Sequence, residues 1–330
     1  MKPKAIFALP PSMYDVIYAG YPRELLDQRV DVIGGPLPEE QLRDYPRLGE
    51  VEILLAGWGT PALVADLLDR MPNLRGVFYG AGSIKRMVTE DFWARGIPVT
   101  SAYQANAVPV AEYAHAAIML SLKRFWYYAG TARRERTWPA IVAVPGAFRS
   151  VVGLVSLGAI GRLVAEKLKN SDLQVVAYDP FVNADTARTL GVRTVALDEL
   201  FRVSDVVSLH TPWLPETEGM ITGALVRSMK PNATILNTSR GAIVREPEMI
   251  EVLRERPDLT AVLDITYPEP PVEGSPLFEL PNVVLTPHIA GSMGPECKRM
   301  GAYMVEEMDR FLAGKPMKWQ ITREQSLRMA

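Results

Sequence analysis

Short apolar runs alternate with amphipathic runs along most of this chain. The apolar runs are rich in aliphatic and β-branched residues and have the length of buried strands. Strands that alternate with helices form parallel sheets covered by helices, so the fold class is α/β with doubly wound sheets. In the first third of the chain we expect strands in KAIFAL, VDVI, VEILLAG, LRGVFYG and IPVT. From Val151 onward we expect a second series in VVGLV, LQVVAY, DVVSL, ATILN, LTAVLD and VVLTP.

Amphipathic segments lie between these strands and predict helices. We expect them in PRELLDQR, PEEQLRDY, TPALVADLLDR and TEDFWARG, and over Ala159–Lys169, Ala184–Leu190, Ala224–Met229 and Glu246–Arg256. One long helix is expected over residues 108–134, with Pro109 in its first turn, where a missing N–H costs nothing. A last helix in PECKRMGAYMVEEMDRFLAGKP should end near Gly314. The segment TWPAIVAVPGAFRS has very few charges, and we expect it to be buried against a second subunit.

Size and composition restrict the class of protein. A chain of 330 residues exceeds the usual size of one core, which favours two domains. A formal net charge of −2 gives no electrostatic basis for a nucleic acid or an anionic membrane as the main partner. The one cysteine, Cys297, excludes a disulfide within the chain, and His115, His210 and His288 lack metal-ligand spacing. With no signal-peptide or membrane-spanning pattern, we expect a reduced, soluble, cytoplasmic protein without a metal.

The segment VSLGAIGR (Val155–Arg162) lies between a predicted strand and a predicted helix, and it nearly matches the dinucleotide fingerprint G-x-G-x-x-G. Gly158 would let backbone N–H groups approach a pyrophosphate, and Gly161 would let the helix pack on the strand. The helix N-terminus would add partial positive charge. Ser156 replaces the first glycine, and we expect it to be tolerated with a φ that stays negative.

An acidic residue follows at the distance that the fingerprint requires. Asp179 ends the next predicted strand, about 20 residues beyond the loop, where a carboxylate accepts the ribose hydroxyls and repels a 2′-phosphate. In isolation the glycine motif fits a simple strand-to-helix turn without a ligand better than it fits a dinucleotide site. The flanking strand, the helix and Asp179 favour a dinucleotide site, with NAD preferred to NADP.

Polar residues follow the later strands of the same predicted sheet, at the edge where such folds bind ligands. Arginine has a rigid fork of donors that suits a carboxylate, so Arg240 is a candidate substrate clamp. His288 can deliver a proton to a carbonyl oxygen, and Glu269 can hold that imidazole in place. Asp264 is placed to contact the nicotinamide side of the cofactor. Taken singly, each residue fits a surface ion pair, a solvated loop or a strand cap, so the joint pattern carries the prediction.

The joint pattern resembles the D-isomer-specific 2-hydroxyacid dehydrogenase family, which includes D-lactate, D-glycerate, D-3-phosphoglycerate and formate dehydrogenases. The resemblance runs from about Leu74 to Pro316 and is carried by GLVSLGAIGR, YDP, VVSLHTPWLPETEGMI, LNTSRGAIV, AVLDITYPEPP and NVVLTPHIAG. It implies an oxidoreductase that transfers a hydride between NAD(H) and a 2-keto/D-2-hydroxy acid. In that reaction Arg240 would bind substrate and His288, paired with Glu269, would be the acid/base.

The resemblance also implies a Rossmann NAD-binding domain inserted in a flavodoxin-like substrate domain, in a homodimer. Residues 1–105 would begin the substrate domain, residues 106–290 would form the NAD-binding domain with the dimerisation helix and loop, and residues 291–330 would return to the substrate domain. The GAG loop would bind the substrate carboxylate through Ala81 and Gly82, together with Arg240. The predicted cofactor contacts are Ser156, Gly158, Ala159, Ile160, Gly161, Asp179, His210, Thr211, Pro212, Thr238, Asp264 and Gly291.

Two other classes of protein remain as alternatives. An NAD-sensing scaffold is possible on the same fold, since transcriptional corepressors occur in this family, and it could keep the same Arg–Glu–His set. A methyltransferase could also use a glycine-rich loop, but it would not need those three residues. The identity of the 2-hydroxy acid stays open, because SIKRM and Ser101–Gln104 depart from the family pattern near the expected substrate loop.

Overall fold

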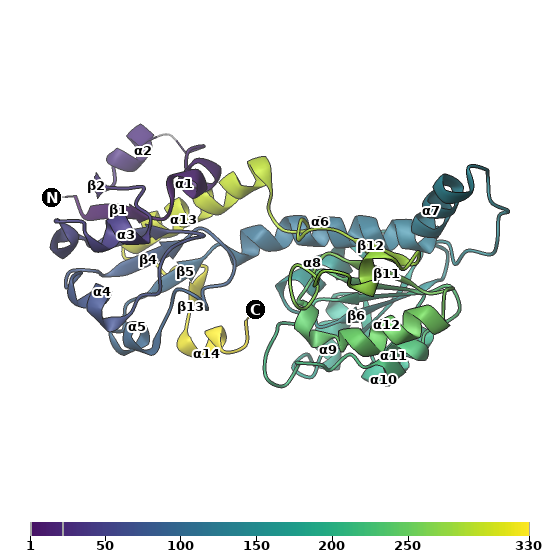
Figure 1. Cartoon of the computed structure of the whole chain (residues 1–330). Coiled ribbons are helices and arrows are strands. Elements are labelled where there is room, and N and C mark those ends of the chain that lie inside the picture. The colour runs from purple at the N-terminus through teal and green to yellow at the C-terminus, as the bar shows by residue number, and fades with distance from the viewer. Residues whose placement is uncertain (1, 22, 330) are drawn as a thin grey trace. The chain divides into compact units, whose positions relative to one another are not determined.

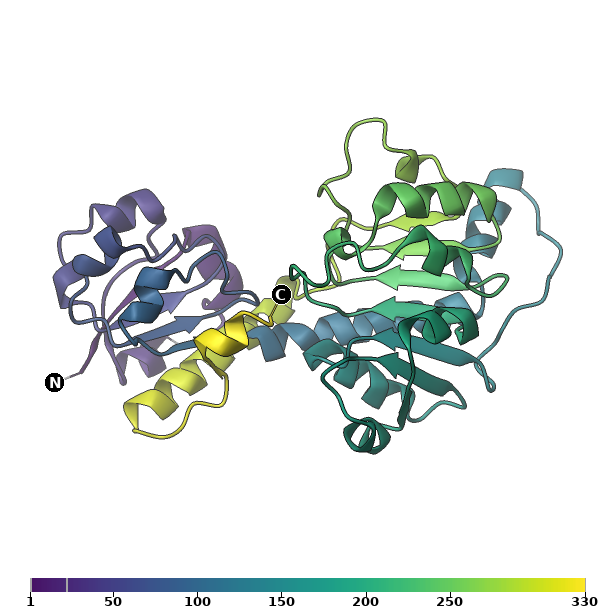
Figure 2. The same cartoon turned by 90° about the horizontal axis from the view of Figure 1, so that it is seen from below.

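A computed structural model describes residues 2–21 and 23–329, and its contacts divide the chain into two compact units. Unit 1 comprises Met1–Asn106 and Ser292–Ala330, and unit 2 comprises Ala107–Gly291. Each unit has a sheet with helices on both faces (Figures 1 and 2). Pro22, with which one of the predicted helices starts, lies outside the described residues.

The sheet of unit 1 has the strand order β13-β5-β4-β3-β1-β2. All neighbours pair in parallel except β13, which is antiparallel to β5. Without β13, this is the 2-1-3-4-5 order of flavodoxin-like folds. The strands are β1 (Lys4–Ala8), β2 (Asp31–Gly34), β3 (Ile53–Ala56), β4 (Gly76–Tyr79), β5 (Val99–Ser101) and β13 (Gln320–Ile321).

Helices cover both faces of this sheet because alternate residues of its strands are buried on opposite sides. One cluster joins Ile6, Leu54 and Val77 to α3, α4 and α5, and the other joins Phe7, Leu55 and Phe78 to α1, α2 and α13. The helices are α1 (Pro11–Ile17), α2 (Arg23–Asp27), α3 (Glu39–Arg43), α4 (Ala65–Asp69), α5 (Glu90–Ala94), α13 (Cys297–Leu312) and α14 (Arg323–Ser326), with 3₁₀ turns at Leu48–Glu50 and Gly294–Glu296.

The sheet of unit 2 is parallel throughout, in the order β12-β11-β10-β9-β6-β7-β8. Counted from β6, this is the 3-2-1-4-5-6 order of the Rossmann fold with one further strand at the β12 edge. The sequence did not predict β8, which has three residues of which only Val192 is buried. The strands are β6 (Val151–Val155), β7 (Gln174–Tyr178), β8 (Val192–Thr194), β9 (Val206–Leu209), β10 (Thr234–Asn237), β11 (Thr260–Leu263) and β12 (Val283–Leu285).

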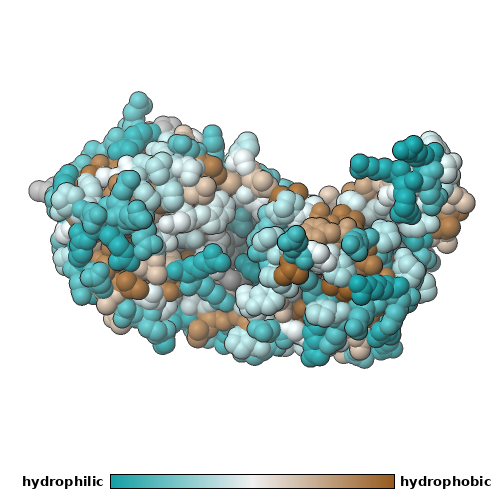
Figure 3. Space-filling model, viewed as in Figure 1, coloured by the Kyte–Doolittle hydropathy of each residue, from teal (hydrophilic) through white to brown (hydrophobic). Residues whose placement is uncertain are grey.

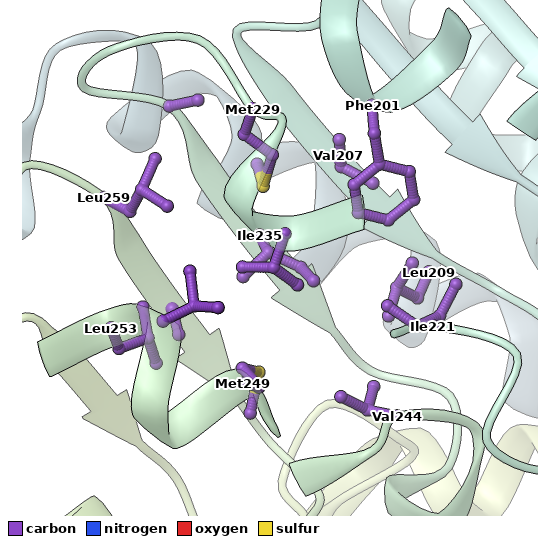
Figure 4. Close-up of a cluster of buried hydrophobic side chains, with 14 of the residues drawn as sticks. Phe201, Val207, Leu209, Ile221, Met229, Ile235, Val244, Met249, Leu253 and Leu259 are labelled. Carbon is purple, nitrogen blue, oxygen red and sulfur yellow. The ribbon is translucent and has the colours of Figure 1, made fainter. Parts of the chain in front are cut away.

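Two layers of helices bury this second sheet. Figure 4 shows one of the two clusters, in which Val207 and Ile235 from the strands meet Phe201, Met249 and other residues of the helical layer. On the opposite face, α6 and α8 pack against β6, β9, β10 and β11. The helices are α6 (Tyr103–Leu122), α7 (Phe125–Glu135), α8 (Ala159–Leu168), α9 (Ala184–Thr189), α10 (Leu197–Val203), α11 (Gly223–Arg227) and α12 (Glu246–Glu255), with 3₁₀ turns at Gly241–Ile243 and Pro276–Phe278.

The long helix predicted over residues 108–134 is wrong in two respects. The chain breaks at Arg124, whose left-handed φ of 51° ends the helical path and separates α6 from α7. Pro109 lies inside α6 instead of in its first turn, because the helix begins earlier. The start is fixed by Ser101, whose Oγ accepts the N–H of Tyr103 at 3.2 Å, and by Ala105, which is buried in the core of unit 1.

The apolar segment after α7 forms neither helix nor strand and has large exposed side chains. Trp138 is 96% exposed, Ile141 92% and Phe148 68%. Figure 3 shows hydrophobic atoms at the right-hand edge, where this segment runs beside α7. The burial of this segment against a second chain therefore stays a prediction. No helix within the described ranges has both the length and the apolar composition needed to cross a membrane.

Candidate active site

The strand ends of unit 2 bring most of the candidate residues into one row. In the pairing register, Leu209 lies beside both Val155 and Asn237, and Leu263 lies beside both Asn237 and Leu285. The strand order reverses at β6, between β9 and β7, which is the switch point where Rossmann sheets bind ligands. The residues that follow these strand ends are Ser156, His210, Thr238, Asp264 and Thr286.

The glycine loop has the shape that a dinucleotide requires. A Cβ added to Gly161 would lie 2.1 Å from the carbonyl oxygen of Ser156, so only glycine allows this close contact between α8 and the loop. Gly158 is the N-cap of α8, and a Cβ there would meet no atom nearer than the Ser156 Oγ at 3.8 Å. The N-terminus of α8, with Ala159 and Ile160, therefore opens onto space that an anionic ligand can enter.

Ser156 does not have the expected conformation. Its φ is +80°, in the left-handed region, so the prediction of a negative φ is wrong. The Ser156 N–H still donates to the carbonyl oxygen of Tyr178 at 2.8 Å, which extends the β6–β7 ladder, and the chain then turns sharply into α8. This turn is the reason that glycine is favoured at the position. Ser156 therefore adopts a backbone conformation that L-residues rarely take.

Asp179 is joined to the glycine loop. Its Oδ2 accepts the N–H of Leu157 at 2.7 Å and lies 3.4 Å from the Ser156 Oγ, while its Oδ1 accepts the N–H of Phe181 at 2.8 Å. Each carboxylate oxygen has more than one lone pair, so these bonds leave acceptor capacity for ribose hydroxyls. The carboxylate predicted to contact the cofactor thus lies directly beside the loop.

Buried polar atoms without partners lie along the same row. The Nδ1 of His210 and the Oγ1 of Thr238 are buried, and within the described part of the chain neither has a hydrogen-bond partner. The His210 Nε2 lies 3.0 Å from the Ser208 Oγ, and burial lowers the pKa of His210 to about 4, so the ring is neutral. Orphaned buried polar atoms are rare in native proteins. A bound dinucleotide would supply partners, so the residues present fit this cofactor.

The loop after β9 is held by its own contacts. Thr211 donates to the carbonyl oxygen of Val155 at 3.3 Å, and the Pro212 carbonyl accepts the hydroxyl of Thr217 at 2.6 Å. At the other end of the candidate set, Gly291 is the last residue of unit 2. The structure therefore places His210 and Thr211 beside Val155, the residue before the glycine loop, and Pro212 follows them in the chain, whereas Gly291 lies at a boundary between the units.

His288 and Glu269 form a close pair in unit 2. The His288 Nδ1 and the Glu269 Oε1 are 2.6 Å apart, with about half of each side chain exposed. Glu269 lies in the loop after β11 and His288 in the loop after the neighbouring β12. We call residues 286–290 the His288 loop. Because one ring nitrogen is bound to the carboxylate, the Nε2 remains to meet a substrate.

Arg240 follows β10 at the same edge of the sheet and is half-buried. Its Nη1 donates to the carbonyl oxygen of Ser239 at 2.6 Å. The chain passes very close to the loop after β11 at this point, since a Cβ on Gly241 would lie 2.1 Å from the backbone of Thr266. The fold thus fixes the backbone of Arg240 next to the segment that leads to Glu269.

Asp264 is more deeply buried and makes more hydrogen bonds than the sequence indicated. It is 2% exposed, and its carboxylate accepts bonds from the His288 loop. Oδ1 accepts the hydroxyl of Thr286 at 2.6 Å and the N–H of Ile289 at 2.9 Å, and Oδ2 accepts the N–H of Ala290 at 2.9 Å. Sequence reasoning missed this role, although the threonine two residues before His288 was a signal for it.

The candidate substrate loop lies in unit 1, whereas Arg240, Glu269 and His288 lie in unit 2. Ala81 is buried and Gly82 is half-buried, and the Ser101 hydroxyl lies within hydrogen-bond distance of both carbonyl oxygens. The hydrogen bonds of the described residues include none donated by the amides of Ala81 or Gly82. Binding of a substrate carboxylate by these amides stays a prediction, and of the two residues only Gly82 is partly exposed.

A Rossmann sheet with this glycine loop and this row of side chains is typical of dinucleotide-binding oxidoreductases. Residues 116–290 match the family model described as D-isomer specific 2-hydroxyacid dehydrogenase, NAD binding domain. The chain is 33% identical over 293 residues to a D-3-phosphoglycerate dehydrogenase of Mycobacterium bovis, covering 88% of this chain and 54% of the relative. It is 31% identical over 261 residues to a glyoxylate reductase of Korarchaeum cryptofilum, covering 78% of each chain.

Among solved structures, the D-mandelate dehydrogenase of Rhodotorula graminis superposes with a TM-score of 0.80 at 24% identity, over 98% of each chain. At that identity the superposition bears on the fold alone. The chain spans about half the length of the phosphoglycerate dehydrogenases that it matches. The chain belongs to the family of D-isomer specific 2-hydroxyacid dehydrogenases, and unit 2 carries the NAD-binding domain of that family.

Proposed function

We propose that this protein is an NAD-dependent oxidoreductase that interconverts a 2-keto acid and a D-2-hydroxy acid. The observation that carries the proposal is the 2.6 Å pair of His288 and Glu269 at the carboxyl edge of an NAD-binding sheet. Relatives named phosphoglycerate dehydrogenase and glyoxylate reductase support the same reaction class.

In this proposal His288 is the acid/base. With its Nδ1 bound to Glu269, the ring presents Nε2, which donates a proton to the substrate carbonyl oxygen during reduction and accepts it back during oxidation. Glu269 orients the ring and stabilises its charged form. Bound NAD(H) supplies or accepts the hydride at the nicotinamide.

Arg240 and the amides of Ala81 and Gly82 bind the substrate carboxylate in this proposal. The guanidinium provides paired donors that fix the orientation of the carboxylate, and it polarises the adjacent carbonyl. Unit 1 then acts as the substrate domain and unit 2 as the cofactor domain, with boundaries near residues 105 and 291.

The cofactor would be held by the row of residues at the sheet edge. Amides of the loop at Gly158 and of the first turn of α8 would bind the pyrophosphate. Asp179 would accept the ribose hydroxyls, so NAD is preferred to NADP. The buried Nδ1 of His210 and Oγ1 of Thr238 would gain partners that they lack among the described residues.

We also propose that the protein is a homodimer and acts in the cytoplasm, where its cofactor is present. The exposed side chains of Trp138, Ile141 and Phe148 support a contact between subunits, because such a set of large apolar groups rarely stays in water. A sedimentation measurement that finds only monomers would contradict the dimer.

The experiment that tests the proposed function is NADH oxidation by the purified protein against a panel of 2-keto acids. The panel includes glyoxylate, pyruvate, hydroxypyruvate, phenylpyruvate and sugar-derived acids. We expect turnover of at least one member. Tight NADH binding without any turnover would favour an NAD-sensing scaffold, and absence of NADH binding would contradict the cofactor site.

A further inference from the structure

The backbone of His288 has a strained conformation. Its φ of 55° lies in the left-handed region, which non-glycine residues rarely adopt. The His288 N–H lies 3.0 Å from the carbonyl oxygens of both Asp264 and Thr286. The next two amides, of Ile289 and Ala290, donate to the Asp264 carboxylate. The conformation that presents the imidazole therefore depends on the position of the Asp264 side chain.

The Asp264 carboxylate is itself held by a chain of hydroxyl groups. The Thr286 hydroxyl donates to the Asp264 Oδ1 at 2.6 Å, and the Tyr113 Oη lies 3.0 Å from the same Thr286 Oγ1. A hydroxyl has one proton, and that of Thr286 is already committed to the carboxylate. The proton in the second bond must therefore come from Tyr113.

Tyr113 is suited to this donor role. It lies on α6 and is half-buried against the core of unit 2. Burial and the nearby charge of Asp264 raise the pKa of Tyr113, so the phenol keeps the proton that it donates. The hydrogen bonds thus run in one direction, from Tyr113 to Thr286 and on to Asp264. The hydrogen bonds of such a chain strengthen one another.

We infer that Tyr113 is a positioning residue for His288, acting through Thr286 and Asp264. The inference rests on the proposed function, in which His288 is the acid/base. Tyr113 would touch neither substrate nor cofactor. It would fix the carboxylate that holds the His288 loop, and therefore the location of the Nε2 that meets the substrate oxygen.

The expected size of the effect follows from this arrangement. A displacement of about 1 Å at a catalytic group can lower the rate by up to about a hundredfold. Tyr113→Phe removes one hydrogen bond of this chain, whereas the Asp264 carboxylate keeps its own three hydrogen bonds. We therefore expect kcat to fall about three- to tenfold. Thr286→Val removes the hydroxyl that contacts the carboxylate directly, and we expect a larger fall. The KM for the keto acid and the Kd for NADH should change less than about twofold in the Tyr113 variant.

A matched control is provided by Tyr45, a half-buried tyrosine of unit 1 whose hydroxyl donates to the carbonyl oxygen of Ile33. Tyr45→Phe removes the same hydroxyl and a comparable hydrogen bond, and it should leave kcat unchanged. A loss of kcat in Tyr113→Phe alone would separate positioning from a general loss of stability. Thermal unfolding of both variants checks that they are folded.

A second readout does not depend on turnover. The chain has three histidines, so the ring signals of His288 can be assigned by NMR with His288→Asn as the reference. The Nδ1 proton shared with Glu269 should give a downfield signal in the unmodified protein. We expect this proton to exchange faster with solvent in Tyr113→Phe and in Thr286→Val, and to be unchanged in Tyr45→Phe.

The inference is overturned if this proton signal and its exchange rate are the same in Tyr113→Phe, Thr286→Val and the unmodified protein. It is also overturned if Tyr45→Phe alters them equally. Failure of the proposed function has a different signature, which is the absence of turnover in the unmodified protein or full turnover in His288→Asn. The NMR comparison decides the positioning role in either case.

Discussion

Adding one methyl group to each of the two glycines of the nucleotide loop should have opposite consequences. Gly158 has φ −68° and ψ −161°, which alanine adopts readily, and its Cβ would meet no atom within 3.8 Å. Gly158→Ala should therefore be as stable as the unmodified protein, or more stable by about 0.4–1 kcal/mol. In the proposed cofactor site, the same methyl group would occupy the space through which the pyrophosphate reaches the backbone. The Kd for NADH should rise at least about tenfold, equivalent to roughly 1.4 kcal/mol.

Gly161→Ala should instead damage the fold. Its Cβ would lie 2.1 Å from the Ser156 carbonyl oxygen, whereas real Cβ contacts are essentially never shorter than 3.0 Å. The backbone would have to move by roughly 1 Å, at a cost of about 2–3 kcal/mol. The expected fall in Tm is roughly 5–10 °C. Thermal unfolding and titration of NADH fluorescence measure both effects. Unchanged NADH affinity in Gly158→Ala, or unchanged Tm in Gly161→Ala, would refute this interpretation of the loop.

Three further predictions concern the same sheet edge. Ser156→Gly removes the strain of a left-handed φ but adds the chain entropy of glycine, so the free energy of unfolding should rise by about 0.5 kcal/mol without loss of NADH affinity. A fall of more than about 1 kcal/mol in the free energy of unfolding, measured with urea, would contradict this prediction. NADPH should bind much more weakly than NADH because of Asp179, and Asp179→Ser should narrow that difference; equal affinities of the unmodified protein would disprove this role. The folded-state pKa of His210, about 4, lies below its unfolded value of about 6.5, so its contribution to stability is complete above pH 6.5 and falls by about 3 kcal/mol as the pH drops to 4. The free energy of unfolding of His210→Asn, measured with urea, should depend less on pH than that of the unmodified protein. An equally steep pH dependence would exclude the titration of His210 as the cause.

The sequence was sufficient to predict the fold because buried parallel strands are continuous apolar runs. All of the strands that carry candidate site residues were predicted. The strands that it missed, β8 and β13, are too short to make such a run. The break at Arg124 has no local sequence signal, since neither glycine nor proline stands there.

The sequence predicted the part of the site that is formed by residues following the ends of strands. Glu269 and His288 follow neighbouring strands, and in the structure their side chains are in contact. Backbone conformation was not predictable, as the positive φ of Ser156 shows. Nor was the contact of Tyr113 with Thr286, because residues 173 positions apart in the chain meet only through the packing of α6 on the sheet.

The measurement that tests the central claim most directly is a comparison of His288→Asn with His115→Asn, a half-buried histidine on α6 outside the site. For each variant, kcat with a 2-keto acid and the Kd for NADH are measured. We predict that His288→Asn lowers kcat by about two powers of ten while NADH binds within a few-fold of normal, and that His115→Asn changes neither. Near-normal turnover in His288→Asn would contradict the assignment of His288 as the acid/base.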